Sequence, residues 1–321
     1  MDSMKKVSVL ITNSNTRDVL RFCLQNLEKI KKEEYSELEV VVTDNSSGSD
    51  PSDMMKSEFP WVKLVVTQNN GLAAGLNSAL SLASGDYYLY LGADAFPSKG
   101  TVAGLVEYFE DSENDKVGAA AVKLLLRDGS QDMDGHRGFF TPWASFTHFS
   151  GLEKLFPHSK LFTGYFLSSR DLNTEHEIDS CITHFLFVRR TTQEQVGTWD
   201  ESFFLYGEDV DMCFRIKEAG WKIMYLPQFV AEHWKGVTVG RKESMDVQPK
   251  NVRYVIRGTE ITKTEFLIQM RKSSCDAMEL FYKKHFLGKY PFFVNFMVLF
   301  SIKVLKIFRV VKQKIENKKL E

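Results

Sequence analysis

Two aspartates in this 321-residue sequence follow apolar runs and are of a type and position that could bind a ligand. Asp44 ends the run at 38–43, where its carboxylate could accept hydrogen bonds from the ribose or the base of a nucleotide. Asp94 follows an uncharged run, and one or two such carboxylates suffice for a divalent cation that keeps its waters and a substrate's phosphates. Because aspartate also caps turns and helices, a structural role is favoured over ligand contact for Asp44 taken alone, and Asp94 taken alone is weak evidence for a metal.

A glycine-rich segment at 69–77 lies between these two aspartates and includes Asn69 and Asn77 at its ends. Gly71 and Gly75, four residues apart, could let the start of a helix pack closely on a sheet or let a ligand approach the backbone. The segment is neither a G-x-G-x-x-G fingerprint nor a Walker loop. Close packing and ligand contact therefore both remain open.

The most specific segment is 197–211, which carries five acids within twelve residues. These acids are Asp200, Glu201, Glu208, Asp209 and Asp211, and they lie among the aromatic residues Trp199, Phe203, Phe204 and Tyr206. The helix dipole favours acids in a first turn, but it does not explain the aromatic residues. An apolar wall beside a carboxylate raises its proton affinity, which suits a general base. His233, which follows a predicted strand, is by itself more typical of a packed or surface residue than of a ligand.

An alternation of strands and helices must position these residues. Apolar runs predict strands at 7–12, 38–43, 62–67, 87–91 and 117–126, and helical patterns separate most of them, at 17–31, 72–83 and 101–109. Continuous apolar strands that alternate with helices predict an α/β fold with a mostly parallel sheet flanked by helices. The polar residues that follow the strands then meet at one edge of the sheet. Residues 127–178 show no clear period and predict an excursion that could hold an acceptor.

Taken in order, these segments resemble the inverting family-2 glycosyltransferases of the GT-A fold, especially their rhamnosyltransferase-like branch. That branch typically reads S-V-V-I-V-N-Y-N, V-D-N-x-S, N-x-G-F-A-x-G-N-N, L-N-P-D and G-x-F-D-E-x-F-F-x-Y-x-E-D-x-D. The corresponding segments here read SVLITNSN at 8–15, TDNSS at 43–47, NNGLAAGLN at 69–77, LGAD at 91–94 and GTWDESFFLYGEDVD at 197–211. The resemblance covers about residues 5–235, and its strength lies in the order and spacing of five individually modest motifs.

The resemblance implies a GT-A (Rossmann-like) fold that binds a nucleotide-diphosphate sugar, either dTDP-rhamnose-like or a UDP-hexose. Asp44 would hold the base or the ribose of this donor, with Thr12 and Asn13 beside it. The donor side would further include Asn69, Gly71, Gly75, Asn77 and Asp94. Asp94 and His233 would bind Mg²⁺ or Mn²⁺ across the diphosphate.

The same resemblance assigns the chemistry to the segment at 197–211. Asp209 would be the general base that deprotonates an acceptor hydroxyl, with Glu208 shaping its field. Trp199, Asp200 and Glu201 would contact the acceptor, which is expected to be a polysaccharide or a lipid-linked glycan. Three departures from the family pattern affect selectivity more than the metal and base positions: Ser14 replaces a tyrosine, Gly92-Ala93 replaces Asn-Pro, and 183–186 replaces a short Gly-Ala-rich strand.

The C-terminal part differs from the rest in charge. The whole chain has 41 basic and 42 acidic residues, which argues against a nucleic-acid partner. Residues 283–321, however, hold ten Lys or Arg and only two acids. Apolar residues at helical spacing within 290–315, with lysines on the other side, predict a helix lying in a membrane interface. Packing of this helix on the catalytic domain or on a second subunit, as in a homo-oligomer, is the alternative.

These patterns predict a catalytic domain at 1–240, with a nucleotide-sugar-binding half at 1–125 and an acceptor and catalytic half at 126–240, followed by a helical, basic, amphipathic extension at 241–321. The four cysteines form no C-x-x-C pair, which indicates reduced thiols. No segment reaches the roughly 18 apolar residues of a transmembrane helix. We therefore expect a cytoplasmic protein that is peripheral on the inner face of the cell membrane.

Two other functions fit parts of the sequence. A nucleotidyltransferase on a related sheet would need a glycine-rich loop with a nearby cation after the first strand, where this sequence supplies only Arg17. A non-catalytic nucleotide-binding or scaffold protein could keep the fold, although the retained Glu208-Asp209 pair speaks against it.

Overall fold

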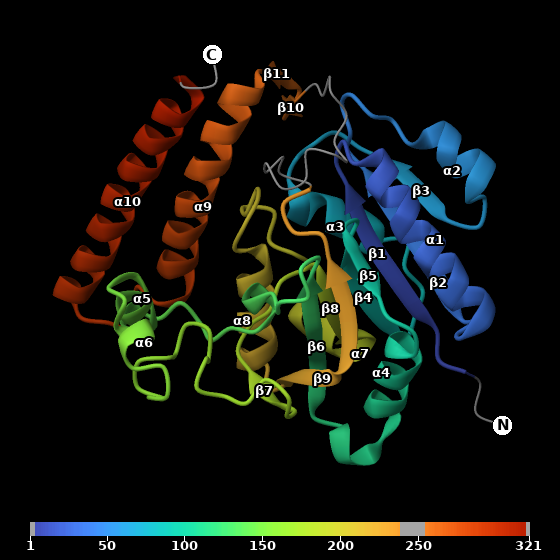
Figure 1. Cartoon of the computed structure of the whole chain (residues 1–321), viewed down its shortest axis with the longest axis horizontal. Coiled ribbons are helices and arrows are strands. Elements are labelled where there is room, and N and C mark those ends of the chain that lie inside the picture. Colours follow the sequence, from blue (N-terminus) through green and yellow to red (C-terminus); the bar gives the residue numbers. More distant parts are fainter. Residues whose placement is uncertain (1–3, 238–253, 319–321) are drawn as a thin grey trace.

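The computed structural model describes residues 4–237 and 254–318 of the chain. Within these residues a nine-stranded sheet carries helices on its faces, and a helical hairpin lies beside it (Figure 1). The α/β fold class expected from the sequence is confirmed. The expected domain boundary between residues 240 and 241 lies outside the described residues.

The N-terminal part of the sheet is parallel, with strand order β3-β2-β1-β4. Its strands are β1 (Val7–Asn13), β2 (Leu38–Asp44), β3 (Lys63–Val66) and β4 (Tyr87–Gly92), and they alternate with α1 (Arg17–Glu33), α2 (Ser52–Glu58) and α3 (Leu72–Leu80). Val9 and Ile11 point into one hydrophobic cluster, whereas Leu10 between them belongs to the cluster on the other face. Burial of both faces explains why these strands are apolar throughout rather than alternating.

The rest of the sheet mixes the two strand directions. β8 (Phe185–Arg189) lies antiparallel between β4 and β6 (Val117–Leu126), and β9 (Lys222–His233) runs parallel to β6. Two short strands, β5 (Ala95–Pro97) and β7 (His176–Ile178), pair antiparallel with β9. The accompanying helices are α4 (Thr101–Glu110), α7 (Arg190–Val196) and α8 (Glu208–Glu218). The sequence pattern found β6 and α4 but not α2, β5 or α7, whose runs are too short to show a period.

The excursion expected at 127–178 is present as a loosely organised segment. It contains two short helices, α5 (Pro142–Phe149) and α6 (Leu152–Leu155), and it returns to the sheet through β7. Figure 1 shows α5 and α6 at one end of the molecule, at the same end as the start of α10.

The C-terminal part comprises a small ribbon and two long helices. The ribbon consists of β10 (Tyr254–Ile256) and β11 (Thr259–Ile261), and the helices are α9 (Lys263–His285) and α10 (Phe292–Lys318). α9 begins with a capping box between Thr262 and Glu265. It packs on α8 through a hydrophobic cluster that joins Phe203 and Phe214 to Phe281. α10 packs along α9.

An ionic cluster also joins α9 to α8. The carboxylate of Asp211 is fully buried and accepts hydrogen bonds from Lys284 and His285 of α9 and from Arg215 of its own helix. Burial would raise the pKa of Asp211, but the hydrogen bonds from His285 and Lys284 outweigh it and bring the pKa to about 2. Since removal of one partner of a buried ion pair is costly, this cluster ties the hairpin to the body of the molecule.

Candidate active site

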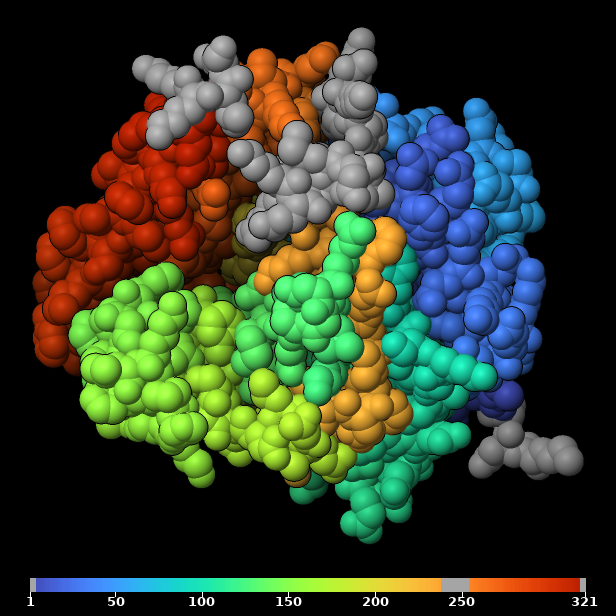
Figure 2. Space-filling view, in the orientation of Figure 1, coloured from blue at the N-terminus to red at the C-terminus, as the bar shows by residue number. Residues whose placement is uncertain are grey.

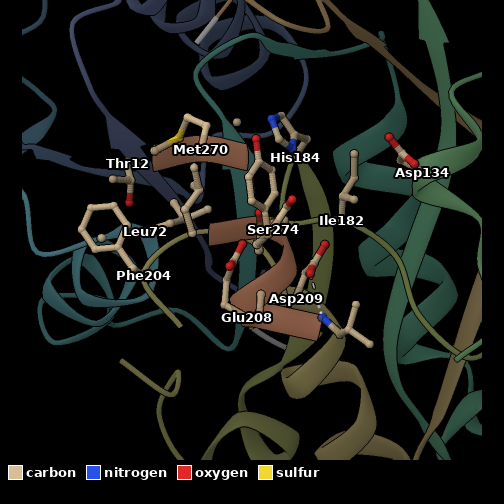
Figure 3. Close-up of a pocket in the computed structure, with 18 of the residues that line it drawn as sticks. Thr12, Leu72, Asp134, Ile182, His184, Phe204, Glu208, Asp209, Met270 and Ser274 are labelled. Atoms are coloured by element: carbon tan, nitrogen blue, oxygen red, sulfur yellow. Dashed lines mark hydrogen bonds between the residues drawn. The ribbon is translucent and has the colours of Figure 1, made fainter. Parts of the chain in front are cut away.

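One cavity of about 430 Å³ lies against the carboxyl ends of β1 and β4 and is lined on its other sides by the excursion, the loop before α8 and α9. Its lining includes both Asp94 and Asp209, so these two distant carboxyl groups lie on one cavity, as the sequence resemblance requires. Figure 3 shows Glu208 and Asp209 together with Thr12, His184 and Phe204, which come from separate parts of the chain.

On the side where the sequence resemblance places the donor, Thr12, Ser14, Asn45 and Asn69 line the cavity. Asn13 and Asp44 instead lie beneath it, buried and joined by a hydrogen bond of 2.7 Å from Asn13 Nδ2 to Asp44 Oδ1. Burial raises the pKa of Asp44 in spite of this hydrogen bond and those from Ser46. In the structure as described, Asp44 therefore holds together the two loops that present the lining residues.

The glycines and asparagine of the segment at 69–77 divide between lining and packing. Gly71 lines the cavity with φ +107°, and a Cβ atom there would lie 2.4 Å from the carbonyl oxygen of Phe204. Gly75 packs against Thr12, because its Cβ position lies 2.6 Å from Thr12 Cγ2. Asn77 donates a hydrogen bond to the Trp199 carbonyl and accepts one from the Trp199 amide. Gly75 and Asn77 thus connect α3 to β1 and to the loop before α8, and neither is among the residues that line the cavity.

Three side chains on the cavity wall form a possible metal site. Asp94, His184 and His233 each offer one ligand atom, and these atoms all lie within 4.8 Å of one another. Asp94 Oδ1 is 3.6 Å from His184 Nε2 and 3.9 Å from His233 Nε2. Asp94 is buried, and neither of its carboxylate oxygens has a hydrogen-bond partner within the described part of the chain. The same is true of His233 Nε2. Buried polar atoms are rarely left unpaired, so this triad fits a bound cation.

The neighbours of the two histidines prepare them to act as ligands. His233 Nδ1–H donates to Asp132 Oδ2 at 2.8 Å, which leaves the Nε2 lone pair directed at Asp94. Burial would raise the pKa of Asp132, but hydrogen bonds from His233 and Lys235 hold it below its usual value, so the carboxylate stays charged. Burial, followed by the nearby His233, lowers the pKa of His184. His184 is therefore neutral, which is the form that binds metals.

Strand register explains why these three residues meet. In the antiparallel pair β5–β9, Ala95 lies opposite His233, and the amide of Trp234 donates to the Asp94 carbonyl. In the antiparallel pair β4–β8, Leu91 lies opposite Phe185, and the next residue, Gly92, donates to the carbonyl of His184. Two registers from different parts of the chain thus place both imidazoles beside Asp94.

His184 is a candidate metal ligand that sequence reasoning missed. Its position was noticed only as a departure from the family pattern, as was Gly92. The structure connects the two departures: a Cβ atom on Gly92 would lie 2.6 Å from His184 Cδ2 and 2.8 Å from Asp94 Oδ1. The glycine therefore makes the space that the histidine occupies.

On the other side of the cavity, Asp209 lies at the start of α8 and is almost fully buried. Its Oδ2 accepts a hydrogen bond of 3.0 Å from Arg137, and its Oδ1 accepts one of 2.8 Å from the Val210 amide. Arg137 comes from the excursion, where mutual backbone hydrogen bonds with Ser180 hold it. The guanidinium orients the carboxylate. No sequence period or motif singled out Arg137.

Glu208 is buried beside Asp209, and its Oε2 has no hydrogen-bond partner within the described residues. Burial and then the charge of Asp209 raise the pKa of Glu208 to about 8. Glu208 is therefore mostly protonated at neutral pH, while it sits next to the base expected from the sequence.

The three residues expected at the acceptor make other contacts. Trp199 is buried in the core, Asp200 accepts a hydrogen bond from Lys284, and Glu201 accepts one from Asn77. None of the three is among the residues that line the cavity. The wall that faces Asp209 is formed instead by side chains of the excursion and of α9, including Phe140, Tyr165 and Met270.

Comparison with known proteins agrees with this architecture. Residues 8–190 match the family model "Glycosyl transferase family 2", and residues 131–304 match "Glycosyl transferase family group 2". The first match spans more than half of the chain, so the chain belongs to glycosyl transferase family 2.

Several curated proteins are similar in sequence. The uncharacterized glycosyltransferase YfnE of Bacillus subtilis is 27% identical over 71% of this chain and 64% of its own length. Rhamnosyltransferase WbbL of Escherichia coli is 25% identical over 52% of this chain and 59% of its own length. An N-acetylglucosaminyl-diphospho-decaprenol L-rhamnosyltransferase of Mycobacterium tuberculosis is 45% identical over a segment that is 17% of this chain and 18% of that protein. The chain thus spans less than two thirds of the length of these relatives.

Among solved structures, the mannosyltransferase PcManGT of Pyrobaculum calidifontis, in complex with GDP-Man and Mn²⁺, aligns with a TM-score of 0.53 at 18% identity. The alignment covers 98% of this chain and 74% of that one. At this identity the likeness shows the shared fold alone.

Proposed function

We propose that this protein transfers a sugar from a nucleotide-diphosphate sugar to a hydroxyl group of a glycan acceptor, with inversion at the anomeric carbon. The observation that carries the proposal is the position of Asp94 and Asp209 on one cavity, the first with unpartnered carboxylate oxygens and the second held by Arg137. Family membership and the resemblance to rhamnosyltransferases support a sugar donor of this class.

In the proposed reaction, the Asp209 carboxylate takes the proton of the acceptor hydroxyl while the acceptor oxygen attacks the anomeric carbon. A new carbon–oxygen bond forms on one face of the sugar as the bond to the diphosphate breaks on the other, so no covalent intermediate is required. Arg137 keeps the Asp209 carboxylate oriented for this proton transfer. A divalent ion on Asp94, His184 and His233 would offset the negative charge of the departing diphosphate.

We further propose that this ion is Mn²⁺ rather than Mg²⁺. Mg²⁺ prefers an octahedral shell of oxygen ligands, whereas two of the three candidate ligands here are imidazoles. Mn²⁺ accepts nitrogen ligands more readily and is the ion in the PcManGT complex. Binding measured by electron paramagnetic resonance and competition with Mg²⁺ would test this preference.

The donor and the reaction are tested together by thermal shift with UDP-, dTDP- and GDP-sugars, each with and without Mn²⁺. A specific donor raises the melting temperature because it binds only the folded chain. Incubation of that donor with candidate acceptors should release the nucleoside diphosphate and form a product whose anomeric configuration, read by NMR, is opposite to that of the donor. Binding without turnover would favour the non-catalytic alternative, and release of pyrophosphate from a nucleoside triphosphate would favour a nucleotidyltransferase.

We also propose that the protein is peripheral on the inner face of the cell membrane. α10 presents its apolar residues outward, with more than half of the surface of each exposed for Phe292, Phe293, Phe296, Met297, Phe300, Ile307 and Phe308. Its side toward α9 buries few apolar side chains, such as Ile302, and includes polar contacts: Gln313 accepts a hydrogen bond from Arg271, and Lys306 pairs with Asp276. A helix in contact with water alone has the opposite arrangement.

The charges of α10 favour a membrane as the occupant of this apolar face. Lys303, Lys312 and Lys314 are exposed on the same helix and can reach anionic headgroups. Among the helices that the structure describes, none has the length and hydropathy required to cross a bilayer. The four cysteines are free thiols, which fits a reducing compartment.

A further inference from the structure

The half of the cavity on the α9 side is apolar. An acceptor that consists of sugar alone does not explain this apolar wall. One stripe of α9 lines it, at positions that share a helix face: Phe266, Met270, Ser274, Ala277, Met278 and Phe281. Phe140, Phe149 and Tyr165 of the excursion line it as well. A binding site for a free sugar would need many hydrogen-bonding groups, whereas such a wall favours a hydrocarbon. Figure 3 shows Met270 and Ser274 among the side chains that surround Glu208 and Asp209.

This apolar half also contains a cation that forms no ion pair with the described residues. Arg309 lines the cavity from α10 and donates hydrogen bonds to Ser274 Oγ at 3.0 Å and to Cys275 Sγ at 3.8 Å. The other cations of the lining are neutralised, since Arg137 pairs with Asp209 and Lys235 pairs with Asp132 and Asp134. No carboxylate of residues 4–237 or 254–317 lies at ion-pair distance from Arg309. A guanidinium in this situation is suited to a phosphate.

The cavity is connected to the exposed apolar surface of the molecule. Phe149 lines the cavity and is nevertheless 51% exposed, so it stands at the cavity mouth. Trp143 and Phe146 of the same helix, α5, are exposed beside it, as are Leu155 and Leu161 further along the excursion. Figure 2 shows this segment, in green, next to α10, in red, on one side of the molecule.

We propose that the acceptor is a lipid phosphate, a glycan joined through phosphate to a long hydrocarbon chain. The inference rests on the proposed function, because it assigns the second substrate of the same site. The acceptor hydroxyl lies at Asp209, the phosphate is bound by Arg309, and the hydrocarbon follows the α9 stripe past Phe149 toward the membrane on which α10 lies. One cavity thereby contacts the polar and the apolar part of a single amphiphile.

Isothermal titration of the full chain, with Mn²⁺ and a nucleoside diphosphate present, tests this with three probes: farnesyl phosphate, farnesol and inorganic phosphate. We expect farnesyl phosphate to bind at least tenfold more tightly than either of the other two. Arg309→Gln should lower the affinity for farnesyl phosphate at least tenfold. Arg309→Lys, which keeps the charge, should lower this affinity less. Met270→Gln combined with Met278→Gln should remove most of the advantage of farnesyl phosphate over inorganic phosphate.

Lys312→Gln is the matched control, because Lys312 is an exposed cation three residues further along α10 and is not part of the cavity lining. It should leave farnesyl phosphate binding unchanged. Equal affinity for inorganic phosphate and farnesyl phosphate, or equal losses in the Arg309 and Lys312 variants, would overturn the inference. Binding of the nucleoside diphosphate with Mn²⁺ to the same variants is a separate readout, and its absence in the unaltered chain would count against the proposed function instead.

Discussion

The proposed donor side and the proposed acceptor side of the cavity are built in different ways. On the donor side, polar side chains sit at the ends of β1 and β4 or on residues that pair with them, so hydrogen-bonded strand register determines their positions. On the acceptor side, the wall comes from a loose excursion and from one face of α9, which hydrophobic packing and the Asp211 cluster hold against α8. The comparison teaches that strand register places the candidate metal site, whereas side-chain packing places the wall opposite it.

The largest expected effect is a loss of turnover on replacing Asp209, which lies where the two sides of the cavity meet. Asp209→Asn keeps the shape and the hydrogen bond from Val210 but removes the base, so the turnover number should fall by about 10²–10⁴. Donor and Mn²⁺ affinities should change little, because the metal triad is formed by other residues. Steady-state kinetics and titration of the donor measure the two quantities. Turnover within threefold of the parent would assign the base to another group.

The metal triad should give the next largest effect. His184→Ala removes one of three candidate ligands and should lower Mn²⁺ affinity by about 10–100-fold, as measured by electron paramagnetic resonance in the absence of donor. Asp132→Asn should lower it through His233, which would lose its charged hydrogen-bond acceptor. Asp134→Asn is the matched control, since Asp134 also pairs with Lys235 but does not contact a histidine of the triad. An unchanged Mn²⁺ affinity in His184→Ala would exclude His184 as a ligand.

A more moderate effect is expected at the membrane-facing surface. Replacing Phe293, Phe296 and Phe300 together by serine removes much of the exposed apolar area of α10 and should reduce sedimentation with anionic liposomes at least fivefold. Turnover of a short water-soluble acceptor should be retained, because these phenylalanines do not line the cavity. If the protein sediments equally without them, or if light scattering shows that this face joins two copies of the chain, the membrane proposal is wrong.

The last effect concerns the pH dependence of stability rather than activity or binding. In the unfolded chain Glu208 ionises near its ordinary pKa of 4.5, whereas in the folded chain it does so near 8. As pH rises from about 4.5 to 8, the unfolded state releases this proton and the folded state does not, so Glu208 makes folding progressively less favourable. Relative to the parent, Glu208→Gln should therefore gain up to a few kcal/mol of unfolding free energy between pH 4.5 and 8.

Urea denaturation at several pH values measures this difference. The comparison across pH is informative even if the glutamine amide itself lacks a partner, because that cost is the same at every pH. If the difference in unfolding free energy between the variant and the parent is the same at every pH, Glu208 has the same pKa in the folded and the unfolded chain.

Much of the donor side could be predicted from the sequence because local patterns encode it. The apolar runs located β1, β2, β4 and β6 to within a residue or two. The position of Asp94 after one of these runs pointed to that carboxylate, and the family resemblance pointed to Thr12. Asp44, Gly75 and Asn77 show the limit of this reasoning. A turn residue that supports a site and one that lines it have the same sequence signature, and only burial separates them.

The sequence by itself determined the α/β fold and the family and named the carboxylates at 94 and 209 as candidates, because strand periodicity and motif order are properties of neighbouring residues. Only the tertiary structure decided that His184 joins Asp94, that Arg137 holds Asp209, and that the α9 stripe and Arg309, rather than Trp199, Asp200 and Glu201, form the far wall of the cavity. These contacts join residues tens to hundreds of positions apart. Strand register and helix packing create them, and neither leaves a local period in the chain.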